Sequence, residues 1–249
     1  VRSTGDHKGR LYGSDRIGSA RGDSMPDLSE RATAAELIDD PLAITAQEME
    51  QVLRELELVN RWLGGTSASL KAVAPLLSEG TGQAPIRITD VGTGSADIPL
   101  ALVQWCRRRN LRVQIVAIDS SPAVCLLARQ RVADSPQICV VRGDVFRLPL
   151  SRRSTDLILC SAFLHHFSDR QLTEIMSRLR ECAITAIVIN DLQRHRVAYW
   201  SIRLLTRLFS RSPAVRHDGP LSVRKGFHRR ELVDLLKSAG CHDFEIRWR

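Results

Sequence analysis

The sequence lacks several features that would place it in a specialised class of protein. It has no run of about 18 apolar residues free of charge, so we expect no membrane-spanning helix. Its six cysteines lie far apart and form no C-x-x-C pair, which argues against a structural zinc site. No signal peptide is recognisable, so we expect reduced thiols, a cytoplasmic protein and no bound metal.

The composition that remains is that of a globular protein. Hydrophobic residues make up 43% and charged residues 26% of the 249 positions, which excludes fibrous and wholly disordered classes. The length corresponds to one full domain with appendages, or to two small domains. The net charge is +8 and is unevenly distributed. Between Leu192 and Arg230 a single acid, Asp218, stands against ten basic residues, namely Arg194, Arg196, Arg203, Arg207, Arg211, Arg216, Arg224, Lys225, Arg229 and Arg230.

The first part of the chain divides into two predicted segments. Residues 1–40 are predicted to be a disordered N-terminal extension, because the first 24 residues are rich in Gly, Ser, Asp and Arg and have no apolar period. The first methionine is Met25, so residues 1–24 are left out of the fold prediction. Residues 41–82 are predicted to be a helical cap, since apolar residues recur at spacings of three and four up to a Gly64-Gly65 stop.

Residues 83–249 are predicted to form one α/β domain. Short β-branched runs predict strands at residues 86–91, 113–118, 138–142, 155–160, 186–190 and 244–248. Helical patterns fill most of the gaps, at residues 98–110, 123–133, 169–182, 197–210 and 229–239. This alternation predicts a doubly wound, Rossmann-like, mostly parallel sheet with helices on both faces. Within the domain, residues 192–227 are predicted to be a basic amphipathic helix followed by a lid loop that contains Gly219 and Pro220.

A glycine-rich loop follows the first predicted strand. The stretch from Ile88 to Asp97 reads ITDVGTGSAD, and its glycines, Gly92 and Gly94, allow a tight turn and close approach of a ligand. A dinucleotide fingerprint, G-x-G-x-x-G, would require a third glycine where Asp97 stands. The loop is therefore predicted to bind a ligand other than NAD.

This loop resembles motif I of the class I S-adenosylmethionine-dependent methyltransferases. In that family an acid stands two residues before the first glycine, as Asp90 does here, while Ala96 occupies the position of the third glycine. Asp119 and Asp144 end the second and third predicted strands, where family members place the groups that bind the ribose hydroxyls and the adenine amino group. The cofactor-binding residues that the resemblance implies are Asp90, Gly92, Thr93, Gly94, Asp119, Ser120, Asp144, Val145 and Cys160.

The resemblance covers about residues 86–248. Through LHHF and the Asn-Asp pair after the fifth strand, the chain looks closest to the quinone-biosynthesis and small polyketide or phenol methyltransferases. Family members usually finish with an antiparallel strand beside the fifth, and this sequence is predicted to lack it. The cofactor has no phosphates, so carboxylate acceptors rather than a phosphate-binding loop suit it. Three acids at the ends of successive parallel strands meet at one edge of a sheet.

Four residues are candidates for the reacting centre: His165, His166, Asp191 and His217. Methyl transfer from a sulfonium is an in-line displacement, and a general base near pH 7 helps when the acceptor is a phenol, an enol or an acidic carbon. Alternatives stay open at each position. A histidine can stack on the cofactor, an aspartate at a strand end can cap a helix, and a His-Asp pair can be ordinary turn chemistry.

The leading functional prediction is methyl transfer from S-adenosyl-L-methionine to a small hydrophobic aromatic, quinol or polyketide-like acceptor, at O or C. One alternative is an RNA or protein methyltransferase that uses the basic segment 192–230, and another is a non-catalytic protein with the cofactor fold. Nucleic acid is not expected as the partner, because Asn190-Asp191 is followed by Leu192-Gln193 rather than by the Pro-Pro-Tyr/Phe of base methylases. Residues 197–211 are predicted either to contact a membrane surface or to pack with a solvated arginine face. The oligomeric state is left open.

Overall fold

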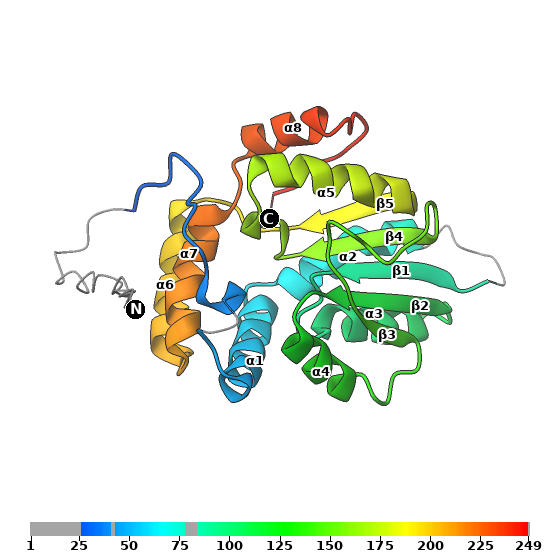
Figure 1. The fold of residues 1–249 in the computed structure, drawn as a ribbon, viewed down its shortest axis with the longest axis horizontal. Helices are drawn as coiled ribbons and strands as arrows, with labels where there is room; N and C mark the ends of the chain where they lie inside the picture. Colours follow the sequence, from blue (N-terminus) through cyan, green and yellow to red (C-terminus); the bar gives the residue numbers. More distant parts are fainter. Residues whose placement is uncertain (1–25, 41–42, 78–83, 249) are drawn as a thin grey trace, which may run out of the picture.

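A five-stranded parallel sheet forms the centre of the fold (Figure 1). The protein is represented by a computed structural model, which describes residues 26–40, 43–77 and 84–248. The strands are β1 (Ile86–Val91), β2 (Val113–Asp119), β3 (Ile138–Arg142), β4 (Thr155–Ser161) and β5 (Ala183–Asn190). They lie in the order β3-β2-β1-β4-β5, and every neighbouring pair is parallel. The predicted doubly wound class and its first five strands are confirmed.

Helices cover both faces of this sheet (Figure 1). One face packs against α2 (Gly65–Leu77), α3 (Asp97–Arg107) and α4 (Pro122–Arg131), and the other against α5 (Asp169–Cys182) and α8 (Arg229–Ser238). Along β4, Leu157 and Leu159 face the first layer, while Ile158 and Cys160 face the second. Because successive side chains of a strand point to opposite faces, a sheet that is covered twice requires these unbroken apolar runs.

A third group of elements lies beyond the carboxyl ends of the strands (Figure 1). It comprises α1 (Ala46–Trp62), α6 (Arg196–Phe209), α7 (Pro213–Lys225) and the short 3-10 helix η1 (Leu37–Asp39). A capping box between Thr45 and Glu48 fixes the start of α1. A second 3-10 helix, η2 (Leu164–His166), follows β4 at the same end of the sheet. This end therefore holds the loops in which α/β proteins bind ligands.

The predicted lid loop at residues 216–222 is wrong, because these residues belong to α7. The side chain of Ser212 caps the helix and Pro213 occupies its first turn. A Cβ atom on Gly219 would lie 3.1 Å from Thr206 Cγ2 and 3.2 Å from Ile202 Cγ1 of α6. The glycine therefore permits close helix packing rather than a turn.

Two further predictions need correction. The strand at residues 244–248 is absent from the described part of the chain, where Phe244 and Ile246 instead pack as partly buried side chains on the α5–α8 layer. The disorder predicted for residues 1–40 is wrong for residues 26–40, which contact the domain; residues 1–25 lie outside the described residues. No helix among the described residues is both long and apolar enough to cross a bilayer.

Candidate functional site

The loop after β1 turns through three residues with left-handed backbone, Gly92 (φ 73°), Gly94 (φ 53°) and Ala96 (φ 59°). A Cβ atom on Gly92 would lie 2.1 Å from Phe163 Cδ2, so only glycine fits at that position. Left-handed backbone costs a residue with a side chain about 1 to 2 kcal/mol, and Ala96 bears that cost where the resembling family has its third glycine. Gly92 and Gly94 line a large cavity at the carboxyl edge of the sheet.

Asp119, at the end of β2, lies beside this loop. Its Oδ2 accepts a hydrogen bond from the amide of Gly94 (3.1 Å), and its Oδ1 accepts one from the amide of Ser121 (3.0 Å). Each carboxylate oxygen has a further lone pair, and both Asp119 and Ser120 line the cavity. The free acceptor capacity of Asp119 fits the ribose hydroxyls of S-adenosylmethionine, which are hydrogen-bond donors.

Asp90, at the end of β1, has a buried carboxyl group. Burial raises its pKa to about 7, and the negative charges of Asp97 and Asp119 add to that rise. Its neighbour Thr93 is also buried, and both residues line the cavity. The acid that precedes the glycine loop therefore titrates near neutral pH.

Three predicted cofactor contacts do not line the cavity: Asp144, Val145 and Cys160. Asp144 is exposed, and its Oδ1 accepts the amide of Phe146 (2.9 Å), which is local turn chemistry. Cys160 is fully buried in the core, where burial raises the pKa of its thiol well above the ordinary value. The described geometry brings together the residues after β1 and β2 but not these three.

Asp191, after β5, organises the residues that follow β4. Its Oδ2 accepts the amides of Phe163, Leu164 and His165 at 3.2, 2.7 and 3.3 Å, and its Oδ1 accepts the amide of Leu192 at 2.8 Å. His165 Nδ1 lies 2.6 Å from the same Oδ1. Burial alone would raise the pKa of Asp191, but His165 and these hydrogen bonds hold it below its usual value. Asp191 thus fixes both the 3-10 turn η2 and the ring of His165.

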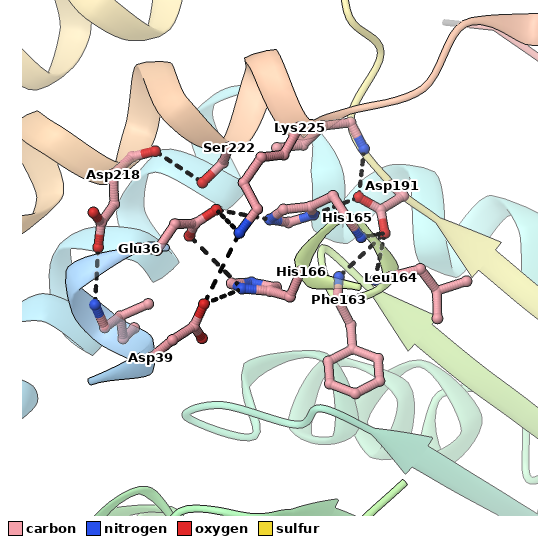
Figure 2. Close-up of polar contacts among 12 residues, drawn as sticks. Glu36, Asp39, Phe163, Leu164, His165, His166, Asp191, Asp218, Ser222 and Lys225 are labelled. Carbon is pink, nitrogen blue, oxygen red and sulfur yellow. Dashed lines mark hydrogen bonds and ion pairs between the residues drawn. The ribbon is translucent and has the colours of Figure 1, made fainter. Parts of the chain in front are cut away.

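His166, next to His165 in η2, pairs with another carboxylate, that of Asp39 (Figure 2). Its Nδ1 lies 2.9 Å from Asp39 Oδ2, and its ring stacks on that of His165 with centroids 4.3 Å apart. Burial lowers the pKa of His166, but the hydrogen bond to Asp39 and the negative charges of Glu36 and Asp39 outweigh burial and raise it above 6.5. Both histidines, Glu36 and Asp39 line the cavity.

Glu36 is the most enclosed acid of this group, with only 3% of its surface exposed. Its Oε1 lies 3.2 Å from Lys225 Nζ and 3.8 Å from His165 Nε2 (Figure 2). Glu36, His165 and His166 present possible metal ligands within 4.8 Å of one another. The ammonium of Lys225 already stands beside Glu36 Oε1 and would repel a metal ion, so we interpret the group as an ion-pair network.

Glu36 and Asp39 are carried by residues 26–40, which we name the N-terminal strap. Arg31 donates hydrogen bonds to the carbonyls of Lys225, His165 and Phe167 and pairs with Asp169 at 2.6 Å. The fully buried Arg194 donates to the carbonyls of Leu28 and Ser29. The carboxylate of Asp218 accepts the amides of Leu37 and Ile38 at 2.9 and 3.0 Å. The strap is therefore fastened along its length over η2 and α7.

Of the four predicted catalytic residues, the structure brings together His165, His166 and Asp191 but not His217. The side chain of His217 is 54% exposed on α7 and does not line the cavity; its Nδ1 lies 2.8 Å from Oδ1 of Asp218. Sequence reasoning missed Glu36, Asp39 and Lys225. The ELIDD stretch that contains both acids was the available signal, but it fell in the segment taken as disordered.

Comparison with known proteins shows what the domain is similar to. Residues 88–183 match the model of a family described as a methyltransferase domain. A curated protein from Pseudomonas putida (strain W619), named tetraacyldisaccharide 4'-kinase, is 26% identical over an alignment of 161 positions that covers 56% of this chain. The match spans 46% of that relative, so this chain corresponds to about half of its length.

Two solved structures have a similar fold. The plantazolicin methyltransferase BpumL, in complex with a triazolic desmethylPZN analogue and SAH, superposes with a TM-score of 0.57 at 17% identity, over 81% of this chain and 70% of that chain. A protein from Methanococcus maripaludis assigned as an S-adenosyl-L-methionine-dependent methyltransferase gives a TM-score of 0.54 at 16% identity, over 78% of this chain and 86% of that chain. Residues 88–183 are thus similar to a methyltransferase domain, and the chain shares the fold of these two methyltransferase structures.

Proposed function

We propose that the protein transfers a methyl group from S-adenosylmethionine to the oxygen or an acidic carbon of a small hydrophobic phenol, quinol or enolic polyketide. The observation that carries this proposal is the shared cavity. Gly92, Gly94 and Asp119 line it from the sheet, and His165 and His166 line it from the turn after β4. A cofactor site and a pair of titratable side chains therefore open into one space.

S-adenosylmethionine supplies the electrophilic methyl group when it is bound. In our proposal, Asp119 accepts hydrogen bonds from the ribose hydroxyls, and the glycine loop lets the backbone approach the cofactor closely. The predicted adenine contact of Asp144 stays a prediction without geometric support. What remains for the rest of the chain is to orient the acceptor, exclude water and remove one proton.

We assign the removal of this proton from the acceptor to His166. Its Nδ1–H donates to Asp39, so in the neutral ring Nε2 carries the lone pair that a base needs. Its side chain is 20% exposed and lines the cavity, whereas His165 is 3% exposed and held between Asp191 and Glu36. We therefore propose His166 as the general base and His165 as the residue that positions it by stacking.

The acceptor is proposed to be apolar because of the side chains that line the cavity beyond the histidines. They are Ile38, Met49, Val52, Leu53, Leu56, Val59, Ile202, Val215 and Val223. A lining of this kind favours an aromatic or aliphatic body, and the few polar groups around His166 would orient its hydroxyl.

The test is incubation with isotopically labelled S-adenosylmethionine and a panel of phenols, quinols and pyrones, followed by mass spectrometry. We expect a labelled product from at least one acceptor, and at least about a hundredfold loss of turnover in His166→Gln. His217→Gln is the matched control and should keep turnover within about twofold. Calorimetry should show SAH binding that Asp119→Ala weakens at least about tenfold. Absence of SAH binding, or full activity of His166→Gln, would overturn the assignment.

Two other functions find less support. Phosphoryl transfer, which the name of the Pseudomonas relative indicates for that protein, uses a G-x-x-x-x-G-K-[ST] loop that this sequence does not contain. An RNA methyltransferase that used the basic segment 192–230 would need its basic residues around the cavity, yet none of the ten Arg and Lys residues of this segment, which lies within the described part of the chain, lines it. Salt-dependent retention of RNA in a gel shift would revive the second function.

A further inference from the structure

Seven of the nine large hydrophobic side chains that are exposed in the described part of the chain belong to two neighbouring segments: the end of α1, and α6. They are Leu58, Trp62, Leu63, Val197, Leu204, Leu208 and Phe209. We name these seven residues the α1–α6 patch. The rings of Trp62 and Phe209 lie 5.8 Å apart, which joins the two segments into one surface. Exposed apolar surface that is concentrated in this way marks an interaction site.

The fold does not require this patch. Tyr199, Ile202 and Thr206 form the buried face of α6, and Gly219 of α7 packs closely against the last two. Val197, Leu204 and Leu208 are spaced by seven and four residues and form a separate exposed stripe along α6. Trp62, at the end of α1, is 66% exposed. Packing of the core within the described residues therefore does not explain why the side chains of the α1–α6 patch are apolar.

Arginines accompany the apolar stripe. Arg196, Arg207 and Arg211 lie on or just after α6 and are exposed, as is Arg61 at the end of α1. The sequence of α6 contains no acid. An apolar stripe flanked by arginines is typical of a helix that lies in the interface of an anionic bilayer. In a symmetric dimer through this patch, the arginines of the two copies would face one another, which disfavours a second copy as the occupant.

The patch also borders the cavity. Leu63 and Val197 are exposed members of the patch, and they line the cavity together with Ala198, Ser201 and Ile202 on the inner side of α6. In Figure 1, α6 lies on the outer side of the layer that covers the carboxyl ends of the strands. A molecule dissolved in a bilayer beneath α6 would therefore meet the mouth of the acceptor cavity without crossing water.

We propose that the α1–α6 patch docks the protein on an anionic lipid bilayer, with α6 in the plane of the interface, and that the acceptor enters the cavity from the lipid. The docking depends only on the patch, whereas the route of the acceptor rests on the proposed function. Trp62 and Phe209 would insert at the level of the headgroups, and the arginines would contact lipid phosphates.

Flotation with vesicles of phosphatidylcholine, with and without phosphatidylglycerol, tests the docking. We expect binding that requires phosphatidylglycerol and weakens at high salt. Replacing both Leu204 and Leu208 by Ser should lower vesicle affinity at least about tenfold. Arg207→Gln should lower it about fivefold, and only on anionic vesicles. Leu126→Ser is the matched control, because Leu126 is 56% exposed but lies on α4; it should leave binding unchanged.

Other results would overturn the docking. One is failure of the unmodified protein to float, and another is a loss of vesicle affinity in Leu126→Ser as large as that in the Leu204 and Leu208 variant. A third is a dimer, detected by light scattering, that dissociates when Leu204 and Leu208 are replaced by Ser. Methyl transfer to a detergent-dispersed acceptor is measured separately on the same variants. In the protein with both Leu204 and Leu208 replaced by Ser, loss of flotation with intact transfer is the result that docking predicts. If the unmodified protein floats but transfers no methyl group, the proposed function fails; if it transfers a methyl group but does not float, docking fails, so the two failures are distinguishable.

Discussion

The carboxyl group of Asp90 is predicted to destabilise the folded protein at neutral and higher pH. Its pKa is raised by burial from 3.8 to about 7, so ionisation costs more in the folded chain than in the unfolded one. That cost is absent below about pH 4, grows between the two pKa values and is fully present above about pH 7. We expect Asp90→Asn to raise the free energy of unfolding by about 2 kcal/mol at pH 8 and to have little effect at pH 4, measured by urea denaturation. An equal effect at both pH values would contradict this explanation.

The pair of His166 and Asp39 predicts the pH dependence of turnover. A base acts when unprotonated, so kcat/KM should fall as pH drops through the raised pKa of His166. Asp39→Asn removes one of the two charges that raise this pKa, so the acid limb of the profile should move to lower pH. Asp134→Asn, an exposed change in the turn that follows α4, should leave the profile in place. A profile unaltered by Asp39→Asn would exclude His166 as the titrating base.

The residues that sequence could locate are those whose role is local. Gly92, Gly94 and Asp119 lie within a few residues of strand ends, and the strand pattern predicted both the ends and the edge they share. Glu36 and Asp39 reach His165 and His166 from more than a hundred residues away along the chain. Contacts of that kind depend on how Arg31 binds the strap to the rest of the chain. The sequence pattern of the strap does not predict this binding.

At the scale of elements, Asp191 ties η2 to the end of β5. Four backbone amides and His165 donate to its buried carboxylate, so Asp191→Ala would leave these donors without a partner. We expect a loss of about 3 to 5 kcal/mol in the free energy of unfolding at pH 7. The folded pKa is depressed, so the stabilisation is present above pH 3.8 and disappears as pH falls through the lower folded value. Asp191→Asn, which keeps one acceptor oxygen, should cost less; equal losses in both variants would contradict the role of these hydrogen bonds.

The elements that were mispredicted share a cause. Gly219 and Pro220 indicate a turn when only local propensity is considered, but the close approach of α6 requires a glycine inside α7. Residues 244–248 alternate apolar and polar side chains as a strand does, yet the carbonyl of Ile246 bonds Arg229 rather than a neighbouring strand. In both places the conformation depends on a tertiary contact that the local sequence pattern does not predict.

At the scale of the molecule, the cavity joins two halves that are built differently. The half that we propose binds the cofactor is formed by the ends of β1 and β2, and its pattern of apolar strands followed by glycine or aspartate could be predicted. The half that we propose binds the acceptor is assembled from the strap, η2, α6 and α7, which meet only in the folded chain. The halves share Phe163, whose ring packs against Gly92 and whose amide bonds Asp191. We therefore expect changes in the strap to affect acceptor chemistry much more than cofactor binding.

Arg31 offers the sharpest test of that separation. Its side chain is 14% exposed, donates to three carbonyls and lies 4.4 Å from the centroid of the Phe227 ring, so it holds the strap against η2 and α7. In Arg31→Ala we expect kcat/KM for the acceptor to fall at least about tenfold, because Glu36 and Asp39 lose their fixed positions. The dissociation constant of SAH, measured by calorimetry, should change less than about twofold. Arg54→Ala, on the exposed face of α1, is the control and should alter neither quantity. A parallel loss of SAH affinity in Arg31→Ala would mean that the strap supports the whole sheet edge rather than the acceptor half alone.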